Sequence, residues 1–147
     1  MIIGIGVDIV HVSRMERWQK IPGLLERYFH PDELRSVRGK GKGINLSLAA
    51  RFAAKEAFGK ALGTGLMGIV LKDIMVKNRH NGQPEIMVMG TAFATLKRSG
   101  ADRIHLSLTH ERDNAVAMVV LESDGQVKDN KGPDINPGPR ERREFTA

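Results

Sequence analysis

Residues 51–65 read Arg-Phe-Ala-Ala-Lys-Glu-Ala-Phe-Gly-Lys-Ala-Leu-Gly-Thr-Gly, and this stretch decides the architecture that we expect for the chain. Within and just before it, alanine recurs every fourth residue, at Ala49, Ala53, Ala57 and Ala61. On a helix this spacing places small side chains in one stripe, which lets a second element approach the backbone closely. The pattern predicts a long helix packed tightly against a neighbour.

Shorter elements flank this helix on both sides. The helix is expected to begin with a cap at Asn45 or Ser47 and to end near Leu62, with Gly63 as a left-handed C-cap. Before it we expect a strand over 2–9, helices over 13–18, 24–29 and 32–37, and a flexible basic loop over 39–43. After it we expect strands over 69–76 and 84–88, a helix over 91–99, and paired strands over 104–109 and 115–121. This mixed order favours an α+β fold over a doubly wound sheet.

The composition excludes several classes of protein. The chain has 147 residues and no cysteine, which rules out thiolate metal sites, iron–sulfur clusters, catalytic thiols and disulfides, and favours the cytoplasm. No apolar run approaches the roughly 18 residues of a membrane span. The apolar start of the chain lacks the basic region of a secretory signal, so we interpret it as a buried strand. We therefore expect a cytoplasmic protein without a membrane segment.

Surplus positive charge is concentrated in the first part of the chain. The net charge is +6, whereas residues 123–147 contain equal numbers of basic and acidic side chains among glycines and prolines. We expect one domain over 1–122 and a disordered tail over 123–147. The charge points to an anionic partner, such as nucleic acid, an acidic lipid surface, a phosphorylated small molecule or an acidic protein. An aromatic content of 5% weakens the case for single-stranded nucleic acid.

The long helix carries the cations Arg51, Lys55 and Lys60 and runs into the turn Gly63-Thr64-Gly65. Backbone N–H groups in such a turn can face an anion, so this segment is a candidate phosphate site. The alternative is structural, because Glu56 and Lys60 lie four residues apart and would form a solvated ion pair.

Asp8 ends an apolar strand, where a charge is costly unless something pairs with it. It could cap the helix that follows. It could instead join Glu56 in holding Mg²⁺, which proteins usually bind through carboxylates from separate elements together with substrate phosphates and water. Ser107 and His110 do not form a nucleophile and base, because residues three apart on a strand point to opposite faces.

Three blocks together resemble the holo-acyl-carrier-protein synthase family of small 4'-phosphopantetheinyl transferases. They are residues 6–8 followed by Arg14, residues 51–65, and Ser-Leu-Thr-His at 107–110, and they match the family across about residues 1–122. The resemblance implies an α+β 4'-phosphopantetheinyl transferase fold, with an antiparallel sheet packed on a long central helix. It also implies a homotrimer whose active sites lie at subunit interfaces. The activity implied is transfer of the 4'-phosphopantetheine arm of coenzyme A to a serine of acidic apo-acyl carrier protein, releasing adenosine 3',5'-bisphosphate.

The same resemblance implies residue roles. Asp8 and Glu56 would bind Mg²⁺ and form the catalytic group together with Lys60. Glu56 would orient or deprotonate the attacking serine, and Lys60 would neutralise the pyrophosphate. Coenzyme A would contact Arg51, Lys60, Gly63, Thr64, Gly65 and His110. The acidic carrier would dock on Arg14, Arg17 and Lys20, with apolar contact from Leu24 and Leu25, although a solvated helix face also explains Arg17 and Lys20.

One departure and two rival functions stay open. His11 stands where family members often carry an acidic residue, so this position supplies no third carboxylate to the metal or its waters. One rival is a nucleic-acid-binding module, whose affinity would fall steeply with salt and be indifferent to Asp8. It would use Arg35, Arg38, Lys40, Lys42 and Arg51. The other is a coenzyme A-binding protein without transferase activity.

Overall fold

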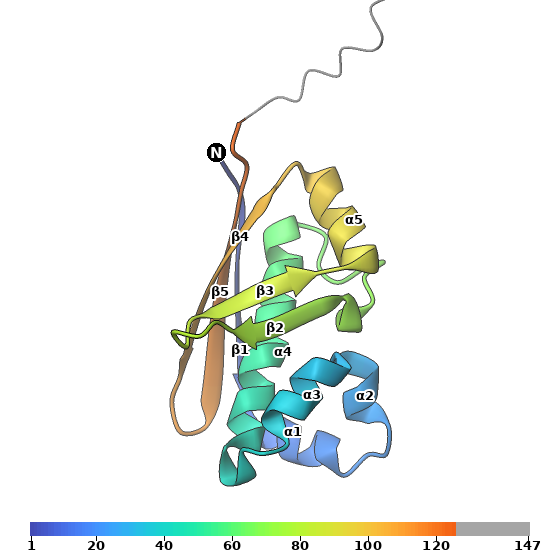
Figure 1. Ribbon diagram of the computed structural model, residues 1–147, viewed down its shortest axis with the longest axis vertical. Helices are drawn as coiled ribbons and strands as arrows, with labels where there is room; N and C mark the ends of the chain where they lie inside the picture. The colour runs from blue at the N-terminus through green and yellow to red at the C-terminus, as the bar shows by residue number, and fades with distance from the viewer. Residues whose placement is uncertain (126–147) are drawn as a thin grey trace, which may run out of the picture.

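The computed structural model describes residues 1–125, which are arranged around helix α4 (Ile44–Leu62) (Figure 1). The elements before it are β1 (Ile2–His11), α1 (Val12–Gln19), α2 (Leu24–Tyr28), α3 (Pro31–Val37) and the 3-10 turn η1 (Gly41–Gly43). Those after it are η2 (Leu71–Asp73), β2 (Ile74–Asn78), β3 (Pro84–Val88), α5 (Gly90–Ser99), β4 (Arg103–His110) and β5 (Asn114–Glu122). The predicted α+β class is confirmed. The predicted tail lies outside the described residues, apart from 123–125.

Two antiparallel sheets pack on α4. The three-stranded sheet has the order β1-β5-β4, and the two-stranded sheet is the β2–β3 hairpin. In Figure 1, α4 runs along the three-stranded sheet, the hairpin crosses α4 on its other side, and α1, α2 and α3 gather at the N-terminal end of α4. This arrangement covers α4 on nearly all sides, which is why its alanine stripe and its aromatic side chains are buried.

Glycines let β1 lie directly against α4. A Cβ atom added at Gly4 would come within 1.9 Å of the Ala61 carbonyl oxygen, and one at Gly6 within 1.9 Å of the Ala57 carbonyl oxygen. Side chains larger than hydrogen would therefore push the strand away from the helix. The predicted close approach along the alanine stripe is confirmed, and it lays Gly4 and Gly6 of β1 beside the last turns of α4.

The helix α4 ends as predicted but begins differently. Gly63 takes the left-handed C-cap conformation with φ 78°. The start is Ile44 after Gly43, without a side-chain cap, so the predicted cap at Asn45 or Ser47 is wrong. The reason is that η1 leads into α4 with Gly43 already in a right-handed helical conformation. Within residues 1–125, no helix has both the length and the apolar character that crossing a bilayer requires.

Two further predictions are wrong. The strand expected over 69–76 begins only at Ile74, because residues 71–73 form a 3-10 turn. Asp8 does not cap the following helix, because β1 continues to His11. His11 is the N-cap of α1, and its Nδ1 accepts a hydrogen bond from the Ser13 N–H. Asp8 therefore does not have the helix-capping role that the local sequence suggested.

Candidate active site

The junction of β1 and α4 pairs Asp8 with Lys60. The Lys60 Nζ donates to Asp8 Oδ1 at 2.8 Å and to the Val7 carbonyl oxygen at 3.1 Å. The Asp8 side chain is 16% exposed and that of Lys60 is 52% exposed, so the pair opens to solvent on one side. Lys60 thus pairs with Asp8 and not with Glu56, and the interpretation of an ion pair within the helix is wrong.

Glu56 lies one turn before Lys60 on α4 and is half-buried. Burial raises the pKa of Glu56, and the neighbouring Asp8 charge raises it further, while Arg14 and Lys60 act in the opposite direction. The hydrogen bond from Lys60 to Asp8 is the main cause of a raised pKa for the lysine. The structure therefore brings Asp8, Glu56 and Lys60 into one electrostatically coupled group, with Arg14 nearby.

The donor set at this junction suits one kind of metal ion. Within residues 1–125 there is no group of three or more His, Cys, Asp or Glu side chains that would hold a metal ion by themselves. A closed structural site of the zinc type therefore does not fit. Two carboxylates fit Mg²⁺, which commonly keeps waters and takes its other ligands from substrate phosphates. His11 contributes no carboxylate, and its Nδ1 contacts Ser13.

The side chains predicted to bind the carrier lie on α1. The Arg14 guanidinium lies 4.9 Å from the ring centroid of Trp18 and 5.0 Å from that of Phe52. Arg17 and Lys20 are exposed, and Leu24 and Leu25 on α2 are partly buried. Arg14, Arg17 and Lys20 form an exposed basic surface, and the Phe52 ring under Arg14 lies one turn before Glu56 on α4.

The turn after α4 folds back on the helix. The Gly63 N–H donates to the Lys60 carbonyl, and the Gly65 N–H donates to the Gly59 carbonyl, both at 3.0 Å. A Cβ at Gly59 would come within 2.7 Å of the Gly65 carbonyl carbon, so only glycine allows this return. The prediction that the turn's N–H groups face an anion is wrong for these two groups. Contact between coenzyme A and this turn, including the exposed Thr64, stays a prediction.

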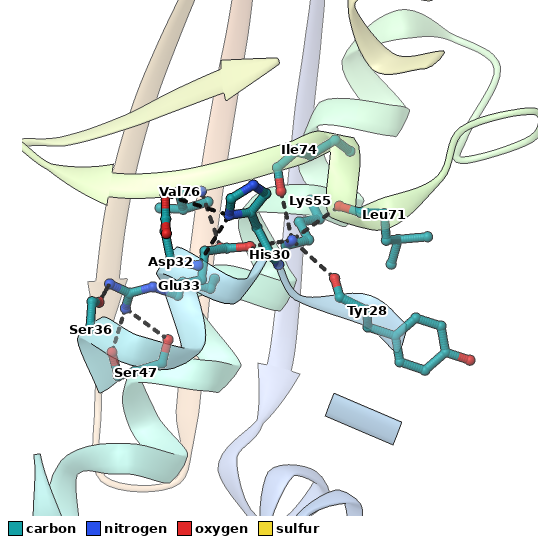
Figure 2. Close-up of polar contacts among 11 residues, drawn as sticks. Tyr28, His30, Asp32, Glu33, Ser36, Ser47, Lys55, Leu71, Ile74 and Val76 are labelled. Carbon is teal, nitrogen blue, oxygen red and sulfur yellow. Dashed lines mark hydrogen bonds and ion pairs between the residues drawn. The ribbon is translucent and has the colours of Figure 1, made fainter. Parts of the chain in front are cut away.

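Lys55 is fully buried and does not face the junction. Its Nζ lies 2.6 Å from Glu33 Oε1 and also donates to the carbonyl oxygens of Tyr28, Leu71 and Ile74 (Figure 2). Burial lowers the pKa of Lys55, and the Glu33 charge opposes that effect. The prediction that Lys55 helps to hold phosphate is wrong, because its ammonium group is enclosed by protein acceptors.

Arg51 lines a separate cavity of about 420 Å³ together with Lys40. It is 5% exposed and donates to the hydroxyl groups of Ser36 and Ser47, and the Lys40 Nζ lies 3.4 Å from the Ser47 hydroxyl. Within residues 1–125 the buried Arg51 Nε has no acceptor. Burial lowers the pKa of both cations, and the Arg51 charge also lowers that of Lys40. Two cations that are held in place by serine hydroxyl groups could bind an anion in this cavity. In the sequence, the basic run at 39–43 was the feature that drew attention to Lys40.

His110 lies apart from Asp8 in the structure. Asp8 and Leu108 both pair with Ala117, so Asp8 and β4 are separated by β5. Two strand spacings amount to about 10 Å, and His110 lies two residues further along β4. One subunit therefore does not bring His110 to Asp8.

Comparisons with known proteins identify the family of the chain. Residues 4–119 match the model of the 4'-phosphopantetheinyl transferase superfamily. A holo-(acyl-carrier-protein) synthase of Treponema denticola is 57% identical over 122 residues, which cover 83% of this chain and 99% of that protein. The crystal structure of the Neisseria meningitidis synthase has a TM-score of 0.76 at 37% identity, covering 84% of this chain and 100% of that one. The Bacillus anthracis synthase, solved in complex with coenzyme A (3',5'-ADP), has a TM-score of 0.71 at 37% identity, covering 84% and 98%.

Proposed function

The chain belongs to the holo-(acyl-carrier-protein) synthase family of 4'-phosphopantetheinyl transferases, and we propose that Asp8, Glu56 and Lys60 form its catalytic centre. The enzyme transfers the 4'-phosphopantetheine arm of coenzyme A to a serine of apo-acyl carrier protein and releases adenosine 3',5'-bisphosphate. The serine oxygen bonds to the phosphorus of the arm while the bond to the bridging pyrophosphate oxygen breaks. The observation that carries the assignment is the half-open Asp8–Lys60 pair with Glu56 beside it.

Asp8 and Glu56 are the residues that would hold Mg²⁺. Of the two Asp8 carboxylate oxygens, Lys60 contacts only Oδ1, which leaves Oδ2 available as a metal ligand. Two nearby carboxylates raise the cost of ionising both, and a divalent cation removes that cost. When bound, the metal neutralises charge on the pyrophosphate of coenzyme A.

Glu56 and Lys60 act on opposite sides of the reaction. The half-buried Glu56 carboxylate is the group that would accept the serine proton, and burial and Asp8 raise its pKa in the metal-free chain. The half-exposed Lys60 ammonium is held by Asp8 and Val7 at the mouth of the site, where it stabilises negative charge on the pyrophosphate. Positioning and charge stabilisation are the main contributions to phosphoryl transfer.

Coenzyme A contacts are assigned to Arg51, Gly63, Thr64, Gly65 and His110, in addition to Lys60. The buried Arg51, with Lys40 beside it, supports a site for a phosphate group away from the reacting pyrophosphate. The acidic carrier is assigned to Arg14, Arg17 and Lys20, because these cations form an exposed basic surface next to Glu56.

A homotrimer with shared active sites is supported by the outer face of the three-stranded sheet. Ile5, Val7 and Ile9 alternate with the residues that face α4 and are 60%, 56% and 62% exposed. Met118, which pairs with Val7 on the neighbouring strand, is 47% exposed. A continuous apolar surface of this kind is suited to burial between subunits. A neighbouring subunit would then supply His110. Analytical ultracentrifugation tests this assembly by its mass.

The nucleic-acid alternative has less support from the structure. Of its cations, Arg51 is buried, Arg35 pairs with Asp32 and Arg38 pairs with Glu26.

We also infer a cytoplasmic location, which the absence of cysteine from the sequence supports.

Intact-mass spectrometry of apo-acyl carrier protein tests the proposed catalytic centre. The wild type with coenzyme A and Mg²⁺ should add one phosphopantetheine arm to the carrier. Glu56→Gln keeps the shape of the side chain but removes the base and the metal ligand, and should slow transfer at least about 100-fold. Glu85→Gln, on the hairpin away from this group, should act like the wild type. A Glu56→Gln enzyme with the wild-type rate would disprove the role of Glu56.

A further inference from the structure

Three aromatic side chains join α1, α2 and α4 beside the proposed site. The ring centroids of Trp18 and Phe52 are 4.8 Å apart in an edge arrangement, and those of Trp18 and Tyr28 are 5.1 Å apart. Phe52 is buried, whereas Trp18 is only partly buried. Trp18 therefore contacts the core with one side of its ring and leaves another side accessible.

Arg14 covers part of this aromatic cluster. Its guanidinium carbon lies 4.9 Å from the Trp18 centroid and 5.0 Å from the Phe52 centroid, within the range of cation–π attraction. No carboxylate within residues 1–125 forms an ion pair with Arg14, so its charge is available to a partner. Phe52 precedes Glu56 by one turn of α4, which places the stacked guanidinium at the rim of the catalytic group.

We propose that Trp18 is a positioning residue for carrier binding, whose ring holds the Arg14 guanidinium in the orientation that meets an acidic side chain of the carrier. This inference rests on the proposed role of Arg14 in binding the carrier. An exposed arginine loses rotamer freedom when it binds, and stacking against two rings in the free enzyme removes part of that cost beforehand. Trp18 acts through Arg14 and not on the reacting atoms, so its effect is on carrier affinity.

Steady-state kinetics with two variants separate positioning from general damage. Trp18→Leu removes the π face and should raise KM for apo-acyl carrier protein about two- to fivefold, the range expected for an exposed cation–π contact. KM for coenzyme A and kcat should change less than twofold. Trp18→Phe keeps an aromatic face and should restore most of the loss. A loss in Trp18→Phe as large as in Trp18→Leu, or equal effects on both KM values, would overturn the proposal.

A double-mutant cycle shows whether Trp18 acts through Arg14. If it does, Trp18→Leu adds less than about 1.5-fold to KM for the carrier in an Arg14→Ala background, because the group that it positions is gone. Fully additive effects would mean that Trp18 acts independently and would contradict the proposal. If Arg14→Ala leaves KM for the carrier unchanged, the proposed docking role of Arg14 fails first. If the wild type does not modify the carrier, the proposed function itself fails.

Fluorescence provides a readout that does not depend on activity. Trp18 is the one tryptophan of the sequence, so its emission reports directly on this ring. Arg14→Ala uncovers the ring face and should increase its quenching by acrylamide, whereas Arg17→Ala, on the same helix, should leave quenching near the wild-type value. Equal quenching in the wild type and in Arg14→Ala would show that the guanidinium does not cover the ring in solution, and would contradict the proposal.

Discussion

Two lysines of helix α4, Lys55 and Lys60, each pair with a carboxylate from another element, and the two pairs differ in burial. Lys55 and Glu33 are 0% exposed, and each is surrounded by further backbone partners. Lys60 lies five residues after Lys55 on α4 and pairs with Asp8 of β1, and these side chains are 52% and 16% exposed. The first pair is enclosed by protein, whereas the second is open to solvent on one side.

If the proposed catalytic centre is correct, one helix supplies both a lysine that stabilises the fold and a lysine that acts in the reaction. In the buried pair, Glu33 also accepts from the His30 and Val76 N–H groups, so it joins α3, α4 and β2 (Figure 2). In the open pair, Lys60 has one carboxylate partner, and a second carboxylate, Glu56, lies nearby. A fully satisfied pair stabilises structure, whereas an incompletely satisfied one retains capacity to bind a metal ion and phosphate.

Breaking the buried pair should have the largest effect. Glu33→Gln leaves the Lys55 ammonium buried without a counter-charge, and should lower the free energy of unfolding by about 3–5 kcal/mol. Chemical denaturation measures this change. Glu26→Gln, which breaks the exposed pair with Arg38, is the matched control and should cost less than about 1 kcal/mol. Equal losses of unfolding free energy in the two variants would mean that burial does not make the Lys55–Glu33 pair more important for stability than the exposed Arg38–Glu26 pair.

Breaking the open pair should reduce activity more than stability. Asp8→Asn removes the proposed metal ligand and the counter-charge of Lys60. It should slow carrier modification at least about 100-fold, which corresponds to a loss of about 2.7 kcal/mol in transition-state stabilisation. The initial rate of mass gain by the carrier measures it. Asp113→Asn, in the exposed turn before β5, provides the control. An Asp8→Asn variant that retained the rate but lost stability would reverse the proposed roles of the two pairs.

Separating β1 from α4 should have an intermediate effect on stability. In Gly6→Ala the new methyl group meets the Ala57 carbonyl, so the strand must shift, at a cost of about 1–3 kcal/mol. The shift also moves Asp8 away from Lys60, and activity should fall. Gly39→Ala meets nothing within 4 Å and should leave thermal unfolding and activity near wild type. Wild-type stability and activity in Gly6→Ala would refute the proposed dependence of the site on this close contact.

The smallest effects concern protonation in the metal-free enzyme. Asp8→Asn should lower the pKa of Glu56, because a neighbouring negative charge is removed, and should lower the pKa of Lys60, because its hydrogen-bonded carboxylate is lost. The raised pKa of Lys60 means that the pair's stabilisation is fully present below pH 10.5 and is lost as pH rises through the folded-state pKa. NMR titration of the Glu and Lys side chains measures both shifts, and unchanged values would contradict the coupling.

The sequence predicted the parts of the fold that depend on local pattern. The alanine stripe indicated a close contact on α4, and Gly63 indicated where the helix ends. The family resemblance singled out Asp8, Glu56 and Lys60 as the expected catalytic residues, and the structure places these three side chains near one another on β1 and α4. Periodicity alone gave no reason to place Asp8 of β1 beside Lys60, 52 residues later on α4, because that contact depends on tertiary packing.

Other features could not be predicted from local sequence. The buried state of Lys55 depends on acceptors from residues 28, 33, 71 and 74, which are distant along the chain. The start of β2 was misplaced because the apolar residues 69–71 were interpreted as part of the strand, whereas residues 71–73 form a 3-10 turn and β2 begins at Ile74. Asp8 resembled a helix cap because the continuation of β1 to His11 is set by its pairing with β5.

The most direct test of the open pair is its dependence on a metal ion. Wild-type enzyme, coenzyme A and apo-acyl carrier protein are incubated with Mg²⁺, with EDTA, and with EDTA followed by excess Mg²⁺, and the intact mass of the carrier is recorded. We predict one added phosphopantetheine arm with Mg²⁺, none with EDTA, and full recovery when Mg²⁺ is restored. Transfer that continues at the same rate in EDTA would contradict the assignment of Asp8 and Glu56 as the ligands of an essential metal ion.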